Sequence, residues 1–257
     1  MHGLGNDFMV ADFVTQDLSP DPRRIAIWGD RRRGIGFDQF LAVCVPDQPE
    51  ADFRYRIFNA DGSEAEQCGN GARCFARFVT ASKLTVKQSL VLQTLAGDIR
   101  TELGQDGNVA VHLPAPDACA PVCVPVAGTE LELIRVSTGN PHAVIFVDDV
   151  RKADVETVGQ ALQNHPMFPD RVNVGFLEVV DRRFARLRVF ERGVGETLAC
   201  GSGASAAMAA ARLAGHLDET ARISLPGGKL QMAWPGPHAT VKMTGPATFV
   251  YEGRVQL

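Results

Sequence analysis

The chain has 257 residues, of which 45% are hydrophobic and 22% charged, a composition typical of a globular protein that buries a core. Its formal net charge of −4 excludes the strongly basic surface with which proteins bind nucleic acid or an anionic membrane. No run approaches the roughly 18 apolar residues of a membrane span, and the N-terminus lacks the basic and apolar regions of a signal peptide. We therefore expect a soluble, cytoplasmic protein that acts on a small molecule, with no nucleic-acid or membrane partner.

The first half of the chain alternates predicted strands with one predicted helix. Runs rich in β-branched or alternating apolar residues predict strands over 54–58, 90–95 and 108–113. The run Cys68-Gly-Asn-Gly-Ala72 lies between the first two and opens a predicted helix over 71–82. Gly97-Asp98 predicts a hairpin turn. Residues 114–128 contain four prolines and predict a linker or an edge segment.

The second half follows a similar order. Strands are predicted over 143–147, 185–190 and 240–243, with a hairpin turn at Gly227-Gly228. The run Cys200-Gly-Ser-Gly-Ala204 opens a predicted helix over 203–215. That helix is apolar on nearly every side, so we expect it to be central and buried.

The two cysteine runs belong to an internal repeat. Placing the block that starts at Phe58 over the one that starts at Phe190 makes Phe, Glu, Cys, two Gly and Ala coincide at a single offset of 132 residues. Matches before and after this block keep the same order with slightly different offsets, which is typical of duplication with small insertions. We therefore predict an α/β chain of the α+β type, with two pseudo-symmetric domains and a cleft between them. Each domain is expected to be a sheet wrapped around a central helix.

Most of the six cysteines have no predicted chemical role. They make up about 2% of the chain, too few for a disulfide scaffold. Cys119 and Cys123 are four residues apart with no second pair to complete a zinc site, so no metal site is expected. Cys44 and Cys74 are interpreted as packing residues.

Cys68 and Cys200 differ because each directly precedes the start of a predicted helix. The N-terminus of a helix presents unpaired N–H groups and a partial positive charge, which lowers the pKa of a thiol and binds a carboxylate or phosphate. Two such cysteines on opposite sides of one cleft provide an acid and a base on the two faces of a carbon atom. One thiolate removes an α-proton and the opposing thiol returns a proton to the other face, which inverts the centre.

The sequence argues against cofactor-based alternatives. It contains neither a phosphate loop ending in Gly-Lys-Ser/Thr nor the dinucleotide fingerprint with its distant acidic residue. A pyridoxal phosphate enzyme needs a Schiff-base lysine, and none of the five lysines lies in the glycine-rich runs. We expect no cofactor.

The motifs together resemble the diaminopimelate epimerase family, and they span nearly the whole chain in family order. They are His2-Gly-Leu-Gly-Asn-Asp-Phe8, Gly36-Phe-Asp-Gln39, the block from Phe58 to Cys74, Gly139-Asn-Pro-His142, Arg171-Val-Asn-Val174, the block from Phe190 to Gly203, and Met243-Thr-Gly-Pro-Ala-Thr248. The resemblance implies cofactor-independent conversion of LL- to meso-diaminopimelate, in lysine and peptidoglycan precursor synthesis, and a homodimer. It also implies mostly antiparallel sheets and an N-terminal domain of residues 1–116 that the C-terminal strand 246–257 completes. Residues 117–245 then form the second domain.

Site residues follow from the resemblance, position by position. Cys68 and Cys200 correspond to the acid/base pair, and His142 and Glu191 to positions that tune the cysteine pKa values. The residues corresponding to the substrate-binding set are Asn6, Gln39, Asn59, Gly69, Asn70, Asn140, Asn173, Glu191, Arg192, Gly201 and Ser202. Amide carbonyls and a carboxylate suit the ammonium groups of an amino acid, and the Arg192 guanidinium suits its distal carboxylate.

Two other functions remain open on the sequence. A related two-cysteine racemase of proline or hydroxyproline would not need the polar set around Glu191 and Arg192, because its substrate has no distal ammonium or carboxylate. A thiol redox protein would use Cys68 and Cys200 as a reversible disulfide, although the absence of Cys-x-x-Cys argues against redox chemistry as the main activity.

Overall fold

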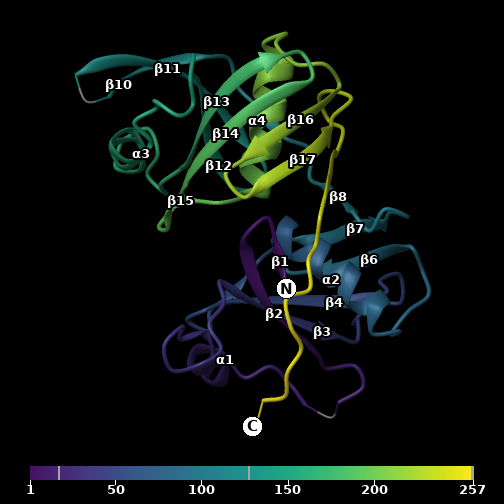
Figure 1. The fold of residues 1–257 in the computed structure, drawn as a ribbon. Helices are drawn as coiled ribbons and strands as arrows, with labels where there is room; N and C mark the ends of the chain where they lie inside the picture. The colour runs from purple at the N-terminus through teal and green to yellow at the C-terminus, as the bar shows by residue number, and fades with distance from the viewer. Residues whose placement is uncertain (17, 127, 256–257) are drawn as a thin grey trace. The chain divides into compact units, whose positions relative to one another are not determined.

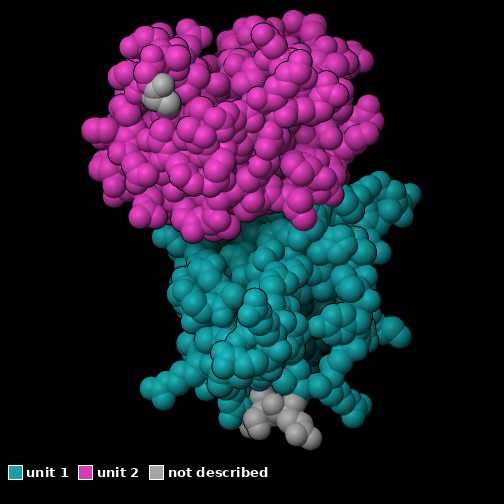
Figure 2. Space-filling model, turned by 60° about the vertical axis from the view of Figure 1, so that its left-hand side comes forward, with its two compact units in different colours: residues 1–111, 245–257 teal, residues 112–244 magenta. Residues whose placement is uncertain are grey.

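The computed structural model describes residues 1–16, 18–126 and 128–255. The chain divides into two compact units, Met1–Val111 with Gly245–Leu257 (unit 1) and His112–Thr244 (unit 2), which Figure 2 colours separately. The predicted domain boundaries, after residues 116 and 245, lie five residues and one residue beyond those of the units. Among the described residues, no helix is long and apolar enough to cross a membrane.

Unit 1 is a sheet with two helices. Its elements in chain order are β1 (His2–Gly3), β2 (Asn6–Asp12), α1 (Pro22–Gly29), β3 (Gln39–Cys44), β4 (Phe53–Asn59), β5 (Glu64–Ala65), α2 (Gly69–Ala81), β6 (Ser89–Thr94), β7 (Gly97–Leu103) and β8 (Val109–Leu113), whose last two residues belong to unit 2. Neighbouring strands pair antiparallel except β2 with β3 and β4 with β6, which are parallel.

Unit 2 repeats this order after two additional strands, β9 and β10. Its elements are β9 (Asp117–Ala118), β10 (Val122–Val126), β11 (Thr129–Ser137), β12 (Pro141–Phe146), α3 (Val155–Gln163), β13 (Asn173–Asp181), β14 (Phe184–Glu191), β15 (Gly195–Thr197), α4 (Gly201–Leu213), β16 (Thr220–Leu225), β17 (Gly228–Ala233) and β18 (Val241–Gly245), whose last residue belongs to unit 1. The parallel pairs are β12 with β13 and β14 with β16, and the other pairs within the unit are antiparallel.

The duplication predicted from the sequence is present in detail. The bounds of α4 are those of α2 moved by 132 residues, and the parallel pairs occupy equivalent places in the two sheets. Even one ion pair is repeated: Arg56 contacts Glu64 at 2.7 Å and Arg188 contacts Glu196 at 2.6 Å. The predicted fold, two similar and mostly antiparallel α+β halves, is confirmed.

Each sheet packs against its cysteine helix, as predicted. α4 contacts β11–β14, β16 and β17 of its own unit (Figure 1), and its residues 203–211 are fully buried. α2 contacts β1, β2, β3 and β7 and buries Phe75 and Val79. Both helices begin two residues earlier than predicted, at Gly69 and Gly201, because the cysteine itself occupies the N-cap position.

Two further helices were not predicted. α1 packs Ile25 into a cluster with Phe40 and Phe58, and α3 packs Val155 and Leu162 against its own sheet. Local signals for both exist in the sequence: Asp21 and Asp154 cap the two N-termini through their side chains, and Pro22 opens α1.

Of three local predictions, one is confirmed and two need correction. The segment 114–128, predicted as a linker or an edge segment, contains β9 and β10, which pair with β11 at the edge of the sheet; its residue 127 lies outside the described residues. The C-terminal segment 246–255 forms a single bridge, Thr248 with His2, instead of a strand, because Pro246 offers no N–H and β1 is only two residues long. Residues 256 and 257 of that predicted strand also lie outside the described residues. Both predicted hairpins exist, but the turns fall at 95–96 and 226–227, so Gly97 and Gly228 begin β7 and β17.

Candidate active site

In unit 1, Cys68 occupies the start of α2 with its backbone extended. Its sulfur accepts a hydrogen bond from the Gly71 N–H at 3.4 Å, and its carbonyl accepts one from the Tyr55 hydroxyl at 3.2 Å. A side chain on Gly71 would place its Cβ 2.1 Å from that hydroxyl, so only glycine allows this close approach. The cap geometry therefore fixes the half-buried Cys68 at the electropositive end of its helix.

Asn6, the first residue of β2, lies beside this cysteine. Its Oδ1 is 3.8 Å from the Cys68 sulfur and 3.4 Å from Asn70 Nδ2. Its Nδ2 donates to Asp38, which also contacts the guanidinium of Arg31 at 2.7 Å. An acidic and a basic side chain that were not predicted as site residues thus hold the Asn6 amide in one orientation.

The other predicted residues of unit 1 lie at facing ends of two strands. Gln39 begins β3 directly opposite Asn59, which ends β4, and Gln39 Nε2 donates to Asn59 Oδ1 at 3.1 Å. Asn59 Nδ2 in turn donates to Ser63 Oγ at 3.0 Å. The amide of Asn59 is therefore fixed from both sides.

In unit 2, Cys200 occupies the equivalent position before α4, but its sulfur has different neighbours. The thiol is 3.1 Å from Glu191 Oε2 and 3.5 Å from Ser202 Oγ, and the residue is 4% exposed. The second oxygen of Glu191 accepts a hydrogen bond from the Thr197 hydroxyl. Glu191 is thus the immediate polar partner of Cys200, on the last residue of β14.

This environment overturns one prediction from the sequence. Burial, together with the Glu191 carboxylate, raises the pKa of the Cys200 thiol well above its ordinary value, although the Gly203 N–H and Ser202 act in the opposite direction. The prediction of a lowered pKa is therefore wrong for Cys200, because burial and Glu191 outweigh the effect of the helix end. Cys200 carries its proton at neutral pH.

The remaining predicted residues of unit 2 form two contacts. His142, buried to 2% exposure, shares a hydrogen bond between its Nε2 and Asn140 Oδ1 at 3.1 Å. Burial, with a smaller contribution from Arg192, lowers the pKa of His142 to about 3, so the ring is neutral at physiological pH. Asn173 Oδ1 accepts a hydrogen bond from the backbone N–H of Arg192 at 2.9 Å. Arg192 itself is exposed, and its guanidinium donates to the backbone carbonyl of Asp170.

The predicted residues thus gather into separate groups within each unit. Asn6, Cys68 and Asn70 meet in unit 1; Glu191, Cys200 and Ser202 meet in unit 2. Gly69 and Gly201 are the first residues of α2 and α4, where backbone N–H groups have no partner one turn earlier in the helix. Each group combines a sulfur with hydrogen-bond donors suited to a carboxylate. Such a combination can transfer a proton at a carbon atom next to a carboxylate group.

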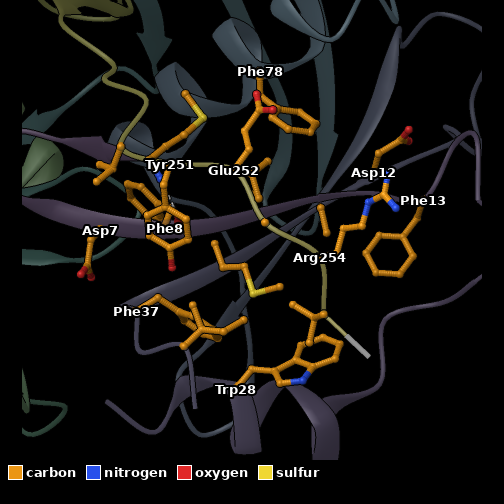
Figure 3. A pocket seen from close by; sticks show the side chains of 18 of the residues that line it. Asp7, Phe8, Asp12, Phe13, Trp28, Phe37, Phe78, Tyr251, Glu252 and Arg254 are labelled. Atoms are coloured by element: carbon orange, nitrogen blue, oxygen red, sulfur yellow. Dashed lines mark hydrogen bonds between the residues drawn. The ribbon is translucent and has the colours of Figure 1, made fainter. Parts of the chain in front are cut away.

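A well-formed hollow lies away from the predicted site residues. A hollow of about 810 Å³ in unit 1 is lined by none of the predicted site residues. Aromatic side chains of Phe8, Phe37 and Trp28 lie beneath the C-terminal segment, which crosses the hollow at Tyr251 and Arg254 (Figure 3). The candidate site therefore rests on the chemistry of the cysteine groups and not on this hollow. Among the described residues, no three His, Cys, Asp or Glu side chains are arranged to hold a metal ion.

The comparisons with known proteins agree on a class of fold. The chain is similar to the solved structure of a phenazine biosynthesis protein of the PhzF family from Bacillus anthracis, with a TM-score of 0.76, 19% identity, and coverage of 100% of this chain and 95% of that one. It is also similar to a probable proline racemase from Agrobacterium radiobacter, with a TM-score of 0.75, 17% identity, and coverage of 100% and 91%. By fold, the protein is therefore a duplicated α+β protein of the kind found in PhzF proteins and proline racemases.

Sequence similarity narrows this class to one family. The family model "Diaminopimelate epimerase" matches residues 1–117 and 134–250. A diaminopimelate epimerase of Azotobacter vinelandii is 54% identical over 269 residues, covering 100% of this chain and 98% of that protein. The chain belongs to the diaminopimelate epimerase family and is an isomerase.

Proposed function

We propose that this protein interconverts LL- and meso-diaminopimelate without a cofactor, in lysine and peptidoglycan precursor synthesis. The observation that carries the proposal is the duplicated arrangement of a cysteine at the N-cap of one helix in each unit, Cys68 and Cys200. Full-length identity of 54% to a diaminopimelate epimerase supports the choice of substrate. The proline and hydroxyproline alternatives rest on likeness of fold alone.

In the proposed reaction, the two cysteines act on opposite faces of one α-carbon. Cys68, as thiolate, takes the α-proton, and the carbon–hydrogen bond breaks. The Cys200 thiol gives its proton to the other face, which forms the new carbon–hydrogen bond with inverted configuration. The raised pKa of Cys200 supports this assignment, since a protonated thiol is needed as the donor. In the reverse direction the roles exchange: Cys200, which the forward reaction leaves as the thiolate, takes the α-proton, and the Cys68 thiol gives its proton to the opposite face.

We further propose that the helix ends hold the reacting carboxylate and that the polar set binds the rest of the substrate. The N–H groups of Gly69, Asn70 and Gly201 with the Ser202 hydroxyl would stabilise charge that builds on the carboxylate, where one such donor is typically worth about 2.7–4 kcal/mol. The exposed guanidinium of Arg192 suits the distal carboxylate. The remaining proposed substrate contacts are Asn6, Gln39, Asn59, Asn140, Asn173 and Glu191, and His142 is proposed to tune the cysteine chemistry as a neutral ring.

Three broader features belong to the same proposal: a cytoplasmic enzyme, domains of residues 1–116 with 246–257 and of residues 117–245, and a homodimer. The hollow of unit 1 supports the homodimer, because Tyr251 and Val250 beside it are 65% and 61% exposed and a second copy would cover them. Sedimentation of the purified protein at several concentrations tests this, and a monomer throughout would contradict it.

The decisive experiment follows hydrogen exchange at the α-carbon. Purified protein is incubated with LL-diaminopimelate in deuterated water without added cofactor, and we expect deuterium at the α-carbon of the meso product, seen by mass spectrometry. Cys68→Ala and Cys200→Ala should each abolish turnover. Cys119→Ala, at an exposed cysteine, is the control and should leave the rate unchanged. Full activity in either Cys68→Ala or Cys200→Ala would overturn the two-cysteine mechanism.

A further inference from the structure

The two copies of the duplicated block differ at two positions that meet in space. With the offset of 132 residues, Glu191 corresponds to Asn59 and Thr197 corresponds to Ala65. In both copies a short strand, β5 or β15, pairs antiparallel with the end of the preceding long strand. The backbone is therefore repeated, while the carboxylate and the hydroxyl occur together only in the second copy.

The pairing of β15 with β14 places Thr197 where it reaches Glu191. Thr197 lies opposite Val189, two residues before Glu191, so the side chains of Thr197 and Glu191 are diagonal neighbours on one face of the sheet. The Thr197 hydroxyl donates to Glu191 Oε1. An ionised carboxylate only accepts hydrogen bonds, which fixes the direction of this one.

The two oxygens of Glu191 thus have separate partners. Oε1 is held by Thr197, and Oε2 is 3.1 Å from the Cys200 sulfur. The main chain of Glu191 is held as well, because Gln163 at the end of α3 donates to its carbonyl at 2.9 Å. Rotation of the carboxyl group away from the thiol would break the Thr197 bond.

We propose that Thr197 is a positioning residue for the epimerisation: its hydroxyl holds the Glu191 carboxylate against the Cys200 thiol. The inference rests on the proposed function. Thr197 acts through Glu191, and its hydroxyl is already used in that bond, so the hydroxyl does not itself bind the substrate. Loss of the hydroxyl leaves the carboxylate free to turn, which slows proton transfer through Cys200 much more than it weakens binding, because Glu191 is one of many proposed substrate contacts.

The test compares Thr197→Val, which removes the hydroxyl at nearly constant volume, with Thr197→Ser, which keeps it. We expect Thr197→Val to lower kcat about 10- to 100-fold, the cost of a misplaced catalytic group, with KM within about twofold of the unmodified protein. Thr197→Ser should recover most of kcat. Thr101→Val is the matched control, because the Thr101 hydroxyl is buried in β7 with no hydrogen-bond partner among the described residues, and kcat should not change.

Each outcome decides the matter. Equal losses in Thr197→Val and Thr197→Ser would overturn the proposal in favour of packing, and a raised KM at constant kcat would place the hydroxyl on the substrate instead. An unchanged kcat in Thr197→Val would also overturn the proposal. Melting temperatures measured alongside separate loss of folding from loss of positioning. If the unmodified protein shows no α-exchange with diaminopimelate, the proposed function fails; if it is active and the variants behave alike, only the role of Thr197 fails.

Discussion

At Cys200 two influences on one thiol act in opposite directions. The start of α4 favours the thiolate, whereas burial and the Glu191 carboxylate 3.1 Å away favour the thiol. Burial and the carboxylate together outweigh the helix end, so the pKa of Cys200 is raised. At Cys68 the sulfur also accepts a backbone N–H, but its neighbouring side chain is the Asn6 amide in place of a carboxylate. Equivalent residues in a duplicated fold therefore have different polar side chains as neighbours.

A second residue-scale consequence concerns His142 and acid stability. Its folded pKa of about 3 lies below the ordinary value of 6.5, so between these values the unfolded chain binds a proton that the folded chain does not. Above pH 6.5 this group therefore leaves the free energy of unfolding unchanged. As the pH drops toward 3 it lowers the free energy of unfolding, by about 3 kcal/mol between pH 7 and pH 4. We expect His142→Gln to unfold less steeply with acid. Urea unfolding at several pH values, followed by the buried Trp234 of the same unit, measures this.

His216→Gln provides the comparison for this prediction, because His216 is exposed. It should keep the steep acid dependence of the unmodified protein. If His142→Gln loses stability with acid as steeply as the unmodified protein does, the buried neutral ring is not the cause.

At the scale of single residues, the sequence is informative only where a pattern repeats. The two cysteines stand out because the same block occurs twice. Asn6 and Asn173 were identified through family resemblance, since isolated asparagines are usually turn residues and their contacts depend on tertiary structure. Asp38 and Thr197 were missed altogether. Thr197 has a signal in hindsight, because it is one of the positions where the two copies differ beside a cysteine.

Among the elements, α2 depends on the contact between Gly71 and Tyr55. We expect Gly71→Ala to destabilise unit 1 by about 1–3 kcal/mol, as overpacking does, and to lower kcat, because the added Cβ would lie 2.1 Å from the Tyr55 hydroxyl. The Tyr55 ring is buried to 1% exposure and has little room to move. Displacing it also disturbs the carbonyl of Cys68 that it binds. Thermal unfolding and steady-state kinetics measure the two effects.

A double variant tests the cause. Tyr55→Phe removes the clashing oxygen, so Gly71→Ala with Tyr55→Phe should be more stable than the sum of the two single losses predicts. Strict additivity would show that the clash is not what destabilises Gly71→Ala.

The elements that the sequence predicted and those it missed differ in how much local information they carry. α4 was predicted because its alanine-rich run is apolar on nearly every side, which is typical of a buried helix. α1 and α3 are only eight and nine residues long, too short for a helical period to be recognised, and the capping signals at Asp21 and Asp154 were overlooked. α3 also needs Gly159, whose Cβ would lie 2.4 Å from the Phe190 ring, a contact that only the folded sheet creates.

For the molecule as a whole, duplication explains the fold more completely than it explains the chemistry. Pairing order, helix bounds and the Arg–Glu ion pair are repeated, so the fold class could be predicted from one block seen twice. The acid/base environment is not repeated, because Glu191 and Thr197 replace Asn59 and Ala65. An enzyme that works in both directions on a carbon with two different faces does not require two identical bases.

The proposed mechanism has a consequence for the intact chain under oxidising conditions. If Cys68 and Cys200 act on one carbon atom, diamide should take two protons and two electrons from the two thiols, becoming the hydrazine, and leave a disulfide between the two cysteines, with loss of activity. A disulfide requires Cα atoms within about 7 Å of each other, so the crosslink reports whether the two sulfurs can meet. The protein should carry Cys119→Ser and Cys123→Ser, since both of these cysteines are exposed and would react first. Mass spectrometry should then find the Cys68–Cys200 peptide pair, and dithiothreitol should restore the rate. Inactivation without that crosslink, or a crosslinked protein that keeps its activity, would contradict the assignment of both sulfurs to one substrate atom.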